Sequence, residues 1–431
     1  MIETISYSSD TESTKLNAIL SRSTDFTPEL EAAVREIVTH VRDRGDEALL
    51  EYTRRFDRAD LTVDDLRVPE TDIESACRSA DPDLIEALRA AAANIRRFHE
   101  AQQRTSWFIE DGDGVVLGKR VLPIERAALL IPGASAPLFS TLLMAVIPAQ
   151  IAGVPNLCIA TPPRPDASVH PNILAAAHIV GVNEIYRVFG AQAVAAFAFG
   201  TTSLPRVDKL VGAGHPSVQI AKKMVFGSVD IDMVAGPSEI VVLADETADP
   251  RHVAADLLSQ AEHGSGFEAA VCITPSARLA ERVAAEIQRQ TASLTHRETI
   301  QKALDNFGAV VVVKDLAEGI ALANRIAPEH IELIVADPWA CLDAVKNAGA
   351  VFLGPASPEP VGDYYAGTNH ILPTAGAARF ASSVGVETFL KTVSIVSYTS
   401  RRLRQTAGHI IRLAEAEGLD AHANAIRVRQ Q

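Results

Sequence analysis

Cysteine is scarce in this sequence, and no apolar stretch is long. The four cysteines stand far apart in 431 residues without a CxxC pair, which excludes a disulfide framework and a thiolate zinc site. The longest apolar run, 142–154, is interrupted by Pro148 and Gln150 and is too short to cross a bilayer. The polar, acidic first residues do not resemble a signal peptide. These absences predict a protein of the reducing cytoplasm with no membrane partner.

Positive charge is also in short supply. The formal net charge is −14 and no run of Lys or Arg interrupts the sequence, which argues against nucleic acid as a partner. A hydrophobic fraction of 47% and a charged fraction of 22% are typical of a folded globular protein. A chain of 431 residues is too long for one ordinary core, so we expect two or three domains.

Hydrophobic periodicity divides the chain into helical ends and an α/β centre. Helix-start signals at Thr27-Pro28 and Asp81-Pro82 precede apolar residues at helical spacing. From Arg126 onward, short β-branched runs alternate with helical stretches, which is typical of parallel sheets covered on both faces. The expected strands are 127–131, 156–160, 184–189, 208–211, 239–244, 269–274, 309–313, 332–335 and 350–353.

The predicted fold class is therefore α/β, with two consecutive Rossmann-like, doubly wound parallel-sheet domains and helical N-terminal and C-terminal extensions. We expect a helical N-terminal arm over 1–120, a first α/β domain over 121–235, a second α/β domain over 236–380 and a helical C-terminal tail over 381–431. A helical tail that leaves an α/β core commonly grips a partner subunit.

Two short polar stretches in the second α/β domain carry candidate chemistry. Gln260 and His263 end an expected helix three residues apart, so both lie on one helical face and can share a cation. The helix dipole also favours a histidine at a helix C-terminus, with no metal involved. Glu329 and His330 precede an expected strand, where one residue can activate a water while the other moves a proton. An ordinary surface turn is the alternative reading of this pair.

The stretch richest in candidate residues is 357–374, an irregular loop that contains Glu359, Asp363 and His370. A loop this long is usually functional or disordered, and its aromatic and apolar residues argue against disorder. Asp363 suits a cation, and His370 suits a cation or a proton. His422 in the tail, taken alone, is more often a surface residue. Because His, Asp and Gln suit a borderline cation such as zinc, we predict a metal-dependent enzyme, with manganese or cobalt as alternatives.

Seven collinear stretches of this sequence closely resemble the histidinol dehydrogenases. They are IPGASAPLFSTLLMAVIPAQIAGV (131–154), GAQAVAAFAFGT (190–201), DMVAGPSEIVVLAD (232–245), DLLSQAEHG (256–264), APEHIEL (327–333), SPEPVGDYYAGTNHILPT (357–374) and EGLDAHANAI (417–426). The resemblance implies a cytoplasmic, zinc-dependent enzyme of histidine biosynthesis. Such an enzyme oxidises L-histidinol to L-histidine through L-histidinal with two NAD⁺.

The resemblance also implies a role for each matching residue. Glu329 and His330 match the acid–base pair, in which the histidine removes the alcohol proton and the glutamate activates the water that attacks the aldehyde. The positions that match zinc ligands are Gln260, His263, Asp363 and His422. The positions that match substrate contacts are Ser238, Gln260, His263, Glu329, Asp363, His370, Glu417 and His422.

Further implications concern assembly and the cofactor. The family is a homodimer whose tail crosses to the neighbouring subunit, which would place Glu417 and His422 in the partner's active site. Cofactor-binding positions are matched by Leu130, Gln192 and His215, but the first and last differ from the usual family residues. These differences leave NADP open as the cofactor. They also leave open a paralogue that oxidises another amino alcohol or a charged diol, and a metal-binding scaffold that has lost nucleotide binding.

Overall fold

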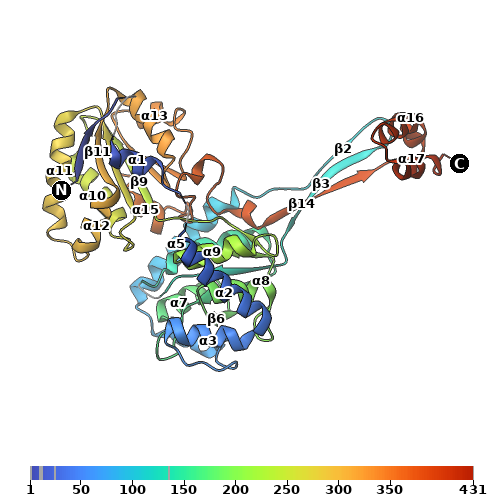
Figure 1. Ribbon diagram of the computed structural model, residues 1–431, viewed down its shortest axis with the longest axis horizontal. Helices are drawn as coiled ribbons and strands as arrows, with labels where there is room; N and C mark the ends of the chain where they lie inside the picture. The colour runs from blue at the N-terminus through green and yellow to red at the C-terminus, as the bar shows by residue number, and fades with distance from the viewer. Residues whose placement is uncertain (1, 9–12, 24–25, 134–135, 431) are drawn as a thin grey trace.

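The chain folds into two α/β lobes and a thin arm that projects from them (Figure 1). The computed structural model describes residues 2–8, 13–23, 26–133 and 136–430. The arm carries the C-terminus at its far end, whereas the N-terminus lies on the outer side of the second lobe (Figure 1). Across these described ranges, no helix is long and apolar enough to cross a membrane.

The first lobe is built on a five-stranded parallel sheet in the order β6-β5-β4-β7-β8. Its first strand in the sequence lies in the middle, and the chain winds outward on both sides of it. Helices α4 to α7 cover one face, and α2, α3, α8 and α9 cover the other. The strands are β4 (Arg126–Leu130), β5 (Asn156–Thr161), β6 (Ile185–Arg187), β7 (Lys209–Val211) and β8 (Asp230–Ile231). The helices are α2 (Pro28–Arg44), α3 (Asp46–Asp57), α4 (Glu70–Ser79), α5 (Pro82–Glu100), α6 (Phe139–Ala152), α7 (Pro171–Ile179), α8 (Ala191–Phe199) and α9 (Pro216–Val225).

The second lobe repeats this winding. Its parallel sheet has the order β1-β11-β10-β9-β12-β13, with the N-terminal strand β1 added at one edge. Helices α10 to α12 cover one face, and α1 and α13 cover the other. The strands are β1 (Glu3–Ser6), β9 (Glu239–Ala244), β10 (Ala269–Thr274), β11 (Gly308–Val312), β12 (His330–Ile334) and β13 (Ala350–Leu353). The helices are α1 (Thr14–Leu20), α10 (Pro250–Ala261), α11 (Ala277–Thr291), α12 (Arg297–Phe307), α13 (Leu316–Ile326), α14 (Pro338–Leu342) and α15 (Glu359–Tyr364).

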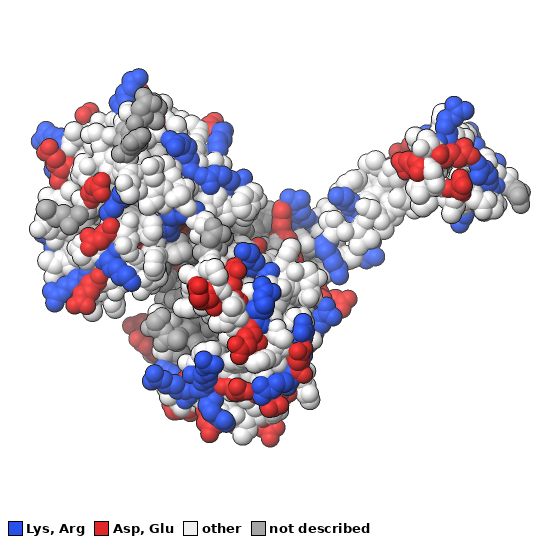
Figure 2. Space-filling model, in the orientation of Figure 1, with Lys and Arg blue, Asp and Glu red and all other residues white. Residues whose placement is uncertain are grey.

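The arm is a three-stranded antiparallel sheet that ends in two helices. The strands β2 (Trp107–Glu110), β3 (Val116–Pro123) and β14 (Leu390–Ser397) pair in the order β14-β3-β2. Helices α16 (Ser400–Ala416) and α17 (Asp420–Arg427) lie at the tip. The middle of the arm is mostly uncharged on the visible face, while Lys, Arg, Asp and Glu mix over the lobes and at the tip (Figure 2).

The predicted fold class is confirmed, since both sheets are parallel, doubly wound and covered on both faces. The apolar pattern did not predict β1, β2, β3, β8 and β14. Strand β2 is exposed along its whole length, so burial imposes no alternation on it. Residues 27–56 form two helices because Gly45 interrupts them at a φ of 57°, a conformation that glycine adopts at little cost. The stretch 357–374 contains the short helix α15.

Candidate active site

The candidate active site is a pocket between the two lobes. On one side is the carboxyl edge of the first sheet, where β7 and β8 end, and on the other the amino edge of the second sheet, where β9 and β12 begin. A carboxyl edge is the common place for ligands in such folds, whereas an amino edge is not. Polar residues that line the pocket include Asp232, Ser238, His263, Glu329, His330, Asp363 and His370.

Glu329 and His330 are adjacent and buried at the start of β12. Glu239 on the neighbouring strand β9 holds both of them. Its backbone N–H donates to Oε2 of Glu329 at 3.0 Å, and its carbonyl oxygen accepts from Nδ1 of His330 at 3.1 Å. Because Nδ1 carries the proton, Nε2 is the basic nitrogen of the neutral ring. This buried Nε2 has no hydrogen-bond partner among the described residues, so it can accept a proton from a bound molecule.

Burial dominates the electrostatics of this pair. It lowers the pKa of His330 to about 3, which keeps the ring neutral at physiological pH. It also raises the pKa of the Glu329 carboxyl well above its ordinary range, and the nearby carboxylates of Glu239 and Asp363 raise it further. A hydrogen bond from Ser238 acts in the opposite direction. The imidazole is therefore uncharged and keeps the Nε2 lone pair free, while the raised pKa of Glu329 favours its protonated form unless a positive charge lies nearby.

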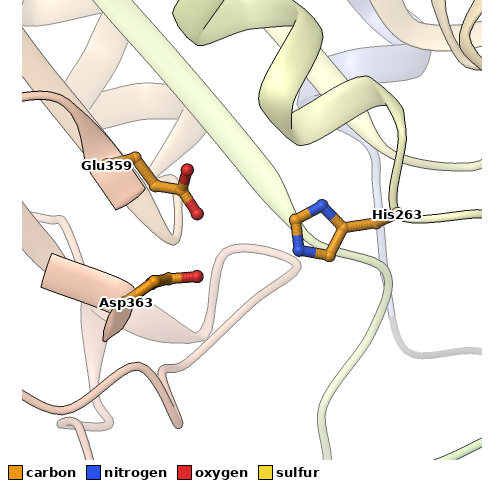
Figure 3. A group of neighbouring side chains, drawn as sticks. All are labelled: His263, Glu359 and Asp363. Atoms are coloured by element: carbon orange, nitrogen blue, oxygen red, sulfur yellow. The ribbon is translucent and has the colours of Figure 1, made fainter. Parts of the chain in front are cut away.

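Three side chains beside this pair form a group with metal-binding geometry. His263, Glu359 and Asp363 each offer a ligand atom, and these atoms lie within 4.8 Å of one another. Figure 3 shows the two carboxylates from α15 pointing toward the imidazole, which follows the end of α10. Nε2 of His330 lies 3.8 Å from Oδ1 of Asp363, so the group adjoins the acid–base pair.

The residues present fit a divalent cation. Oε1 of Gln260 is fully buried and has no hydrogen-bond partner among the described residues, as expected for a ligand oxygen. Burial, together with the nearby carboxyl of Asp363, raises the pKa of Glu359 to about 8, and burial raises the pKa of Asp363 to about 6. Two buried carboxylates beside an imidazole need a positive charge to remain ionised, and a cation supplies it.

Glu359 is a site residue to which the sequence reasoning gave no role. The signal was present, because Glu359 precedes Asp363 by four residues. In a helical turn, that spacing places both carboxylates on one face. The prediction of an irregular loop concealed this relation, which α15 restores.

His370 links the two lobes at the pocket. Its Nε2 lies 2.8 Å from the hydroxyl of Thr141 on α6 of the first lobe. Its Nδ1 lies 3.1 Å from the backbone carbonyl oxygen of Asp363, which can only accept. Nδ1 is therefore protonated, and Nε2 accepts from the hydroxyl. Burial lowers the pKa of His370 to about 4, so the ring is neutral.

The structure does not bring every candidate residue into the pocket. Glu417 ends α16 and His422 lies on α17, at the tip of the arm and far from the pocket of their own chain (Figure 1). Both side chains are exposed. Neither residue lines the pocket of its own chain.

The three candidate cofactor residues lie around the carboxyl edge of the first sheet, but none lines the pocket. Leu130 is fully buried in the core, so its side chain offers no surface to a cofactor. Gln192 is buried in the first turn of α8, and the exposed His215 is the N-cap of α9. The backbone of Gly212 lines the pocket instead.

Gly212 is held by a buried ion pair that the sequence reasoning did not identify. Nζ of Lys222 lies 2.5 Å from Oδ1 of Asp232 and donates to the Gly212 carbonyl oxygen at 2.7 Å. Oδ2 of Asp232 accepts from the Gly212 N–H at 2.7 Å. Both polar groups of this glycine are thus fixed at the pocket wall.

Glu329, His330 and a group with metal-binding geometry face a cleft between two doubly wound domains, an arrangement typical of an enzyme. Residues 20–430 match the family model described as histidinol dehydrogenase. The chain is 52% identical over 396 residues to histidinol dehydrogenase of Heliobacterium mobile, with 92% of each chain covered. It is 46% identical over 426 residues to that of Thermosynechococcus vestitus, covering 98% of this chain and 99% of the relative.

A solved structure agrees with these sequence relatives. The crystal structure of histidinol dehydrogenase from Elizabethkingia anophelis is similar with a TM-score of 0.92 and 37% identity, covering 100% of this chain and 98% of that one. The chain therefore belongs to the histidinol dehydrogenase family and is an oxidoreductase. The resemblance seen in the sequence is confirmed.

Proposed function

We propose that this chain oxidises L-histidinol to L-histidine through L-histidinal, with two NAD⁺ and a bound Zn²⁺, as the last steps of histidine biosynthesis. The observation that carries the proposal is the unpaired Nε2 of His330. It faces the pocket beside the Glu329 carboxyl and lies 3.8 Å from Oδ1 of Asp363 in the metal-binding group. A proton acceptor beside a cation site suits the oxidation of an alcohol, which loses its hydroxyl proton together with a hydride.

The proposed ligands are Gln260, His263 and Asp363, together with His422 of the partner subunit. Bound zinc would hold the amino and imidazole nitrogens of the substrate and so fix its position. Ser238 and His370 line the same pocket and would contact the substrate, and Glu417 of the partner subunit would hold its imidazole.

His330 and Glu329 perform the proton chemistry in this proposal. Nε2 of His330 takes the hydroxyl proton while the hydride leaves the carbon for NAD⁺, which gives the aldehyde. Glu329 then takes a proton from the water that attacks the aldehyde carbon, while His330 gives its proton to the aldehyde oxygen, which forms the hydrate and leaves the imidazole neutral again. His330 takes the hydroxyl proton of the hydrate as the second hydride leaves, which gives the carboxylic acid. Each oxidation thus releases one hydride and one proton.

The activity has a direct test. Purified protein with zinc, L-histidinol and NAD⁺ is expected to form about two NADH per histidine, the stoichiometry of a four-electron oxidation carried by a two-electron cofactor. Absence of both products would refute the proposal. Growth without histidine of a strain that lacks the enzyme, once it receives this gene, would exclude a paralogue with another substrate.

We further propose that the chain is a homodimer with shared active sites. The arm exposes large apolar side chains on its strands, including Trp107, Phe108, Ile109, Val393 and Val396. Large apolar side chains exposed on both faces of a thin sheet are typical of an interface. A second copy would cover it and receive the tip that carries Glu417 and His422.

Mixing two inactive variants tests the shared site. A His330→Ala chain and a His422→Ala chain are each expected to be inactive alone. If the tail serves the neighbouring subunit, one site of the mixed dimer has both histidines and activity returns. If each tail serves its own lobe, the mixture stays inactive.

A further inference from the structure

Arg22 joins the N-terminal segment to the loops beneath the active site. It follows α1, and its side chain is 8% exposed. Its Nε donates to Oε1 of Glu239 at 2.9 Å. Its Nη2 donates to the carbonyl oxygen of Pro237 at 3.0 Å, and its Nη1 to that of Phe267 at 2.5 Å. The guanidinium also lies over the ring of Phe307, 4.8 Å from its centroid. The side chain is therefore fixed on every side.

Glu239 stands between this arginine and the acid–base pair. Besides the two backbone bonds that hold Glu329 and His330, its Oε2 accepts from the backbone N–H of Glu329 at 3.3 Å. Glu239 and Glu329 thus hold each other reciprocally, each carboxyl accepting from the other's backbone amide. The position of one residue on β9 sets the position of both reacting side chains on β12.

The carboxylate of Glu239 is 2% exposed, so its charge must be balanced inside the protein. Among the described residues, Arg22 is the cation that contacts the Glu239 carboxylate. If one partner of a buried pair is removed, the other is left uncompensated and moves toward water or takes up a proton. Either change would break the reciprocal bonds that hold Glu329.

We propose that Arg22 and Glu239 are positioning residues for the acid–base pair, with Arg22 acting through Glu239. The inference rests on the proposed function, because the pair must be the one that reacts. Catalysis would then depend on the N-terminal segment, although none of the described residues of that segment lines the pocket. Neither residue touches the substrate.

Arg22→Met tests this inference. The variant keeps much of the side-chain volume but removes the charge, and a displacement of Glu329 by about 1 Å is expected to lower kcat by about 10- to 100-fold. KM for L-histidinol and zinc content are expected to stay at wild-type values, since the metal ligands keep their partners. Arg22→Lys keeps the charge and is expected to recover most of the kcat.

Lys15→Met is the matched control. Lys15 lies on α1 in the same segment and bonds the carbonyl oxygen of Leu304 at 3.2 Å, with no link to Glu239. This variant loosens the same segment and is expected to leave kcat within about twofold. If Arg22→Met does not fold, Arg22→Gln replaces it, since glutamine keeps donors but lacks the charge. An unchanged kcat in the folded, zinc-loaded Arg22 variant, or an equal loss in Lys15→Met, would overturn the inference.

A crystal structure of the Arg22 variant separates this inference from the proposed function. Glu329 Oε2 is expected to leave hydrogen-bond distance of the Glu239 N–H whatever substrate the enzyme uses. An unmoved Glu329 contradicts the inference even if the wild type oxidises L-histidinol. A wild-type chain that is inactive on L-histidinol contradicts the proposed function, while the displaced carboxyl would still support the positioning role.

Discussion

The protonation state of the buried carboxyl of Glu332, which lies close to the candidate active site, can be tested. Glu332 lies on β12 and is 1% exposed, beside Asp256 of α10. Its Oε1 accepts from the backbone N–H of Glu359 at 2.7 Å, at the start of the helix that carries Asp363. Burial, together with the nearby carboxyl of Asp256, raises the pKa of Glu332 to about 9. Folded protein therefore keeps a proton on Glu332 at neutral pH.

This proton makes the stability depend on pH. The ordinary pKa of a glutamate is 4.5, so the unfolded chain has lost this proton at neutral pH. The stabilisation is fully present below that value and is lost as pH rises toward the pKa of the folded state. The free energy of unfolding falls by at most about 1.4 kcal/mol per pH unit. If the assay pH is raised from about 7 to about 8.5, titration of Glu332 lowers the free energy of unfolding by up to ~2 kcal/mol.

Glu332→Gln removes the titration and keeps the shape. The amide oxygen still accepts from Glu359, and the amide N–H can donate to Asp256. The melting temperature of the variant minus that of the wild type is expected to rise with pH. For a lobe of roughly 200 residues, ~2 kcal/mol corresponds to about 4–8 °C across this range. Thermal unfolding of metal-free protein at several pH values measures it.

Glu298→Gln is the control, because Glu298 is an exposed residue of α12 and the substitution also removes one carboxylate. Its melting difference is expected to stay flat over the same range. If the melting temperature of Glu332→Gln minus that of the wild type also stays flat, or falls as pH rises, the buried carboxyl is not protonated in the folded protein and this prediction is refuted.

Three further tests concern the pocket wall at Gly212 and the metal. Lys222→Met leaves Asp232 buried without its cation and is expected to destabilise the protein by about 3–5 kcal/mol. The control is Lys223→Met. The Lys223 side chain is 55% exposed, so its loss is expected to cost less than about 0.5 kcal/mol. Thermal unfolding compares the two. Gly212→Ala would place a Cβ 2.3 Å from the Leu130 carbonyl oxygen at a φ of +128°, so KM for NAD⁺ is expected to rise more than KM for L-histidinol. Equal rises in steady-state assays would contradict this. Removing metal with a chelator is expected to abolish NADH formation until zinc is restored; persistent activity would exclude the zinc proposal.

Local pattern was sufficient for the elements of the two sheets. Strands β9 and β10 have the bounds that the apolar pattern predicts, because every residue in them is buried and must be apolar or paired. The exposed strands of the arm escaped prediction for the opposite reason. Where no core selects one face, the sequence carries no alternation to detect.

The candidate residues divide in the same way. His263, Glu329, His330, Asp363 and His370 were predicted from residue type and resemblance, and the structure places them in one pocket. The roles assigned to them remain proposals. The structure buries Leu130, which the resemblance matched to a cofactor-binding position, and this corrects that assignment. It also places His422 away from the pocket of its own chain, which agrees with the crossing tail that the resemblance implies.

The sequence by itself determined the α/β class, the rhythm of strands and helices and the polar stretches that bear the chemistry. These follow from hydrophobic periodicity and short-range spacing, which each segment carries within itself. Only the tertiary structure decided which distant groups meet. Arg22 pairs with Glu239 across 217 positions, and Lys222 and Asp232 together hold Gly212. Such contacts depend on how whole sheets and helices pack, since burial creates the need for a partner and the fold alone supplies it.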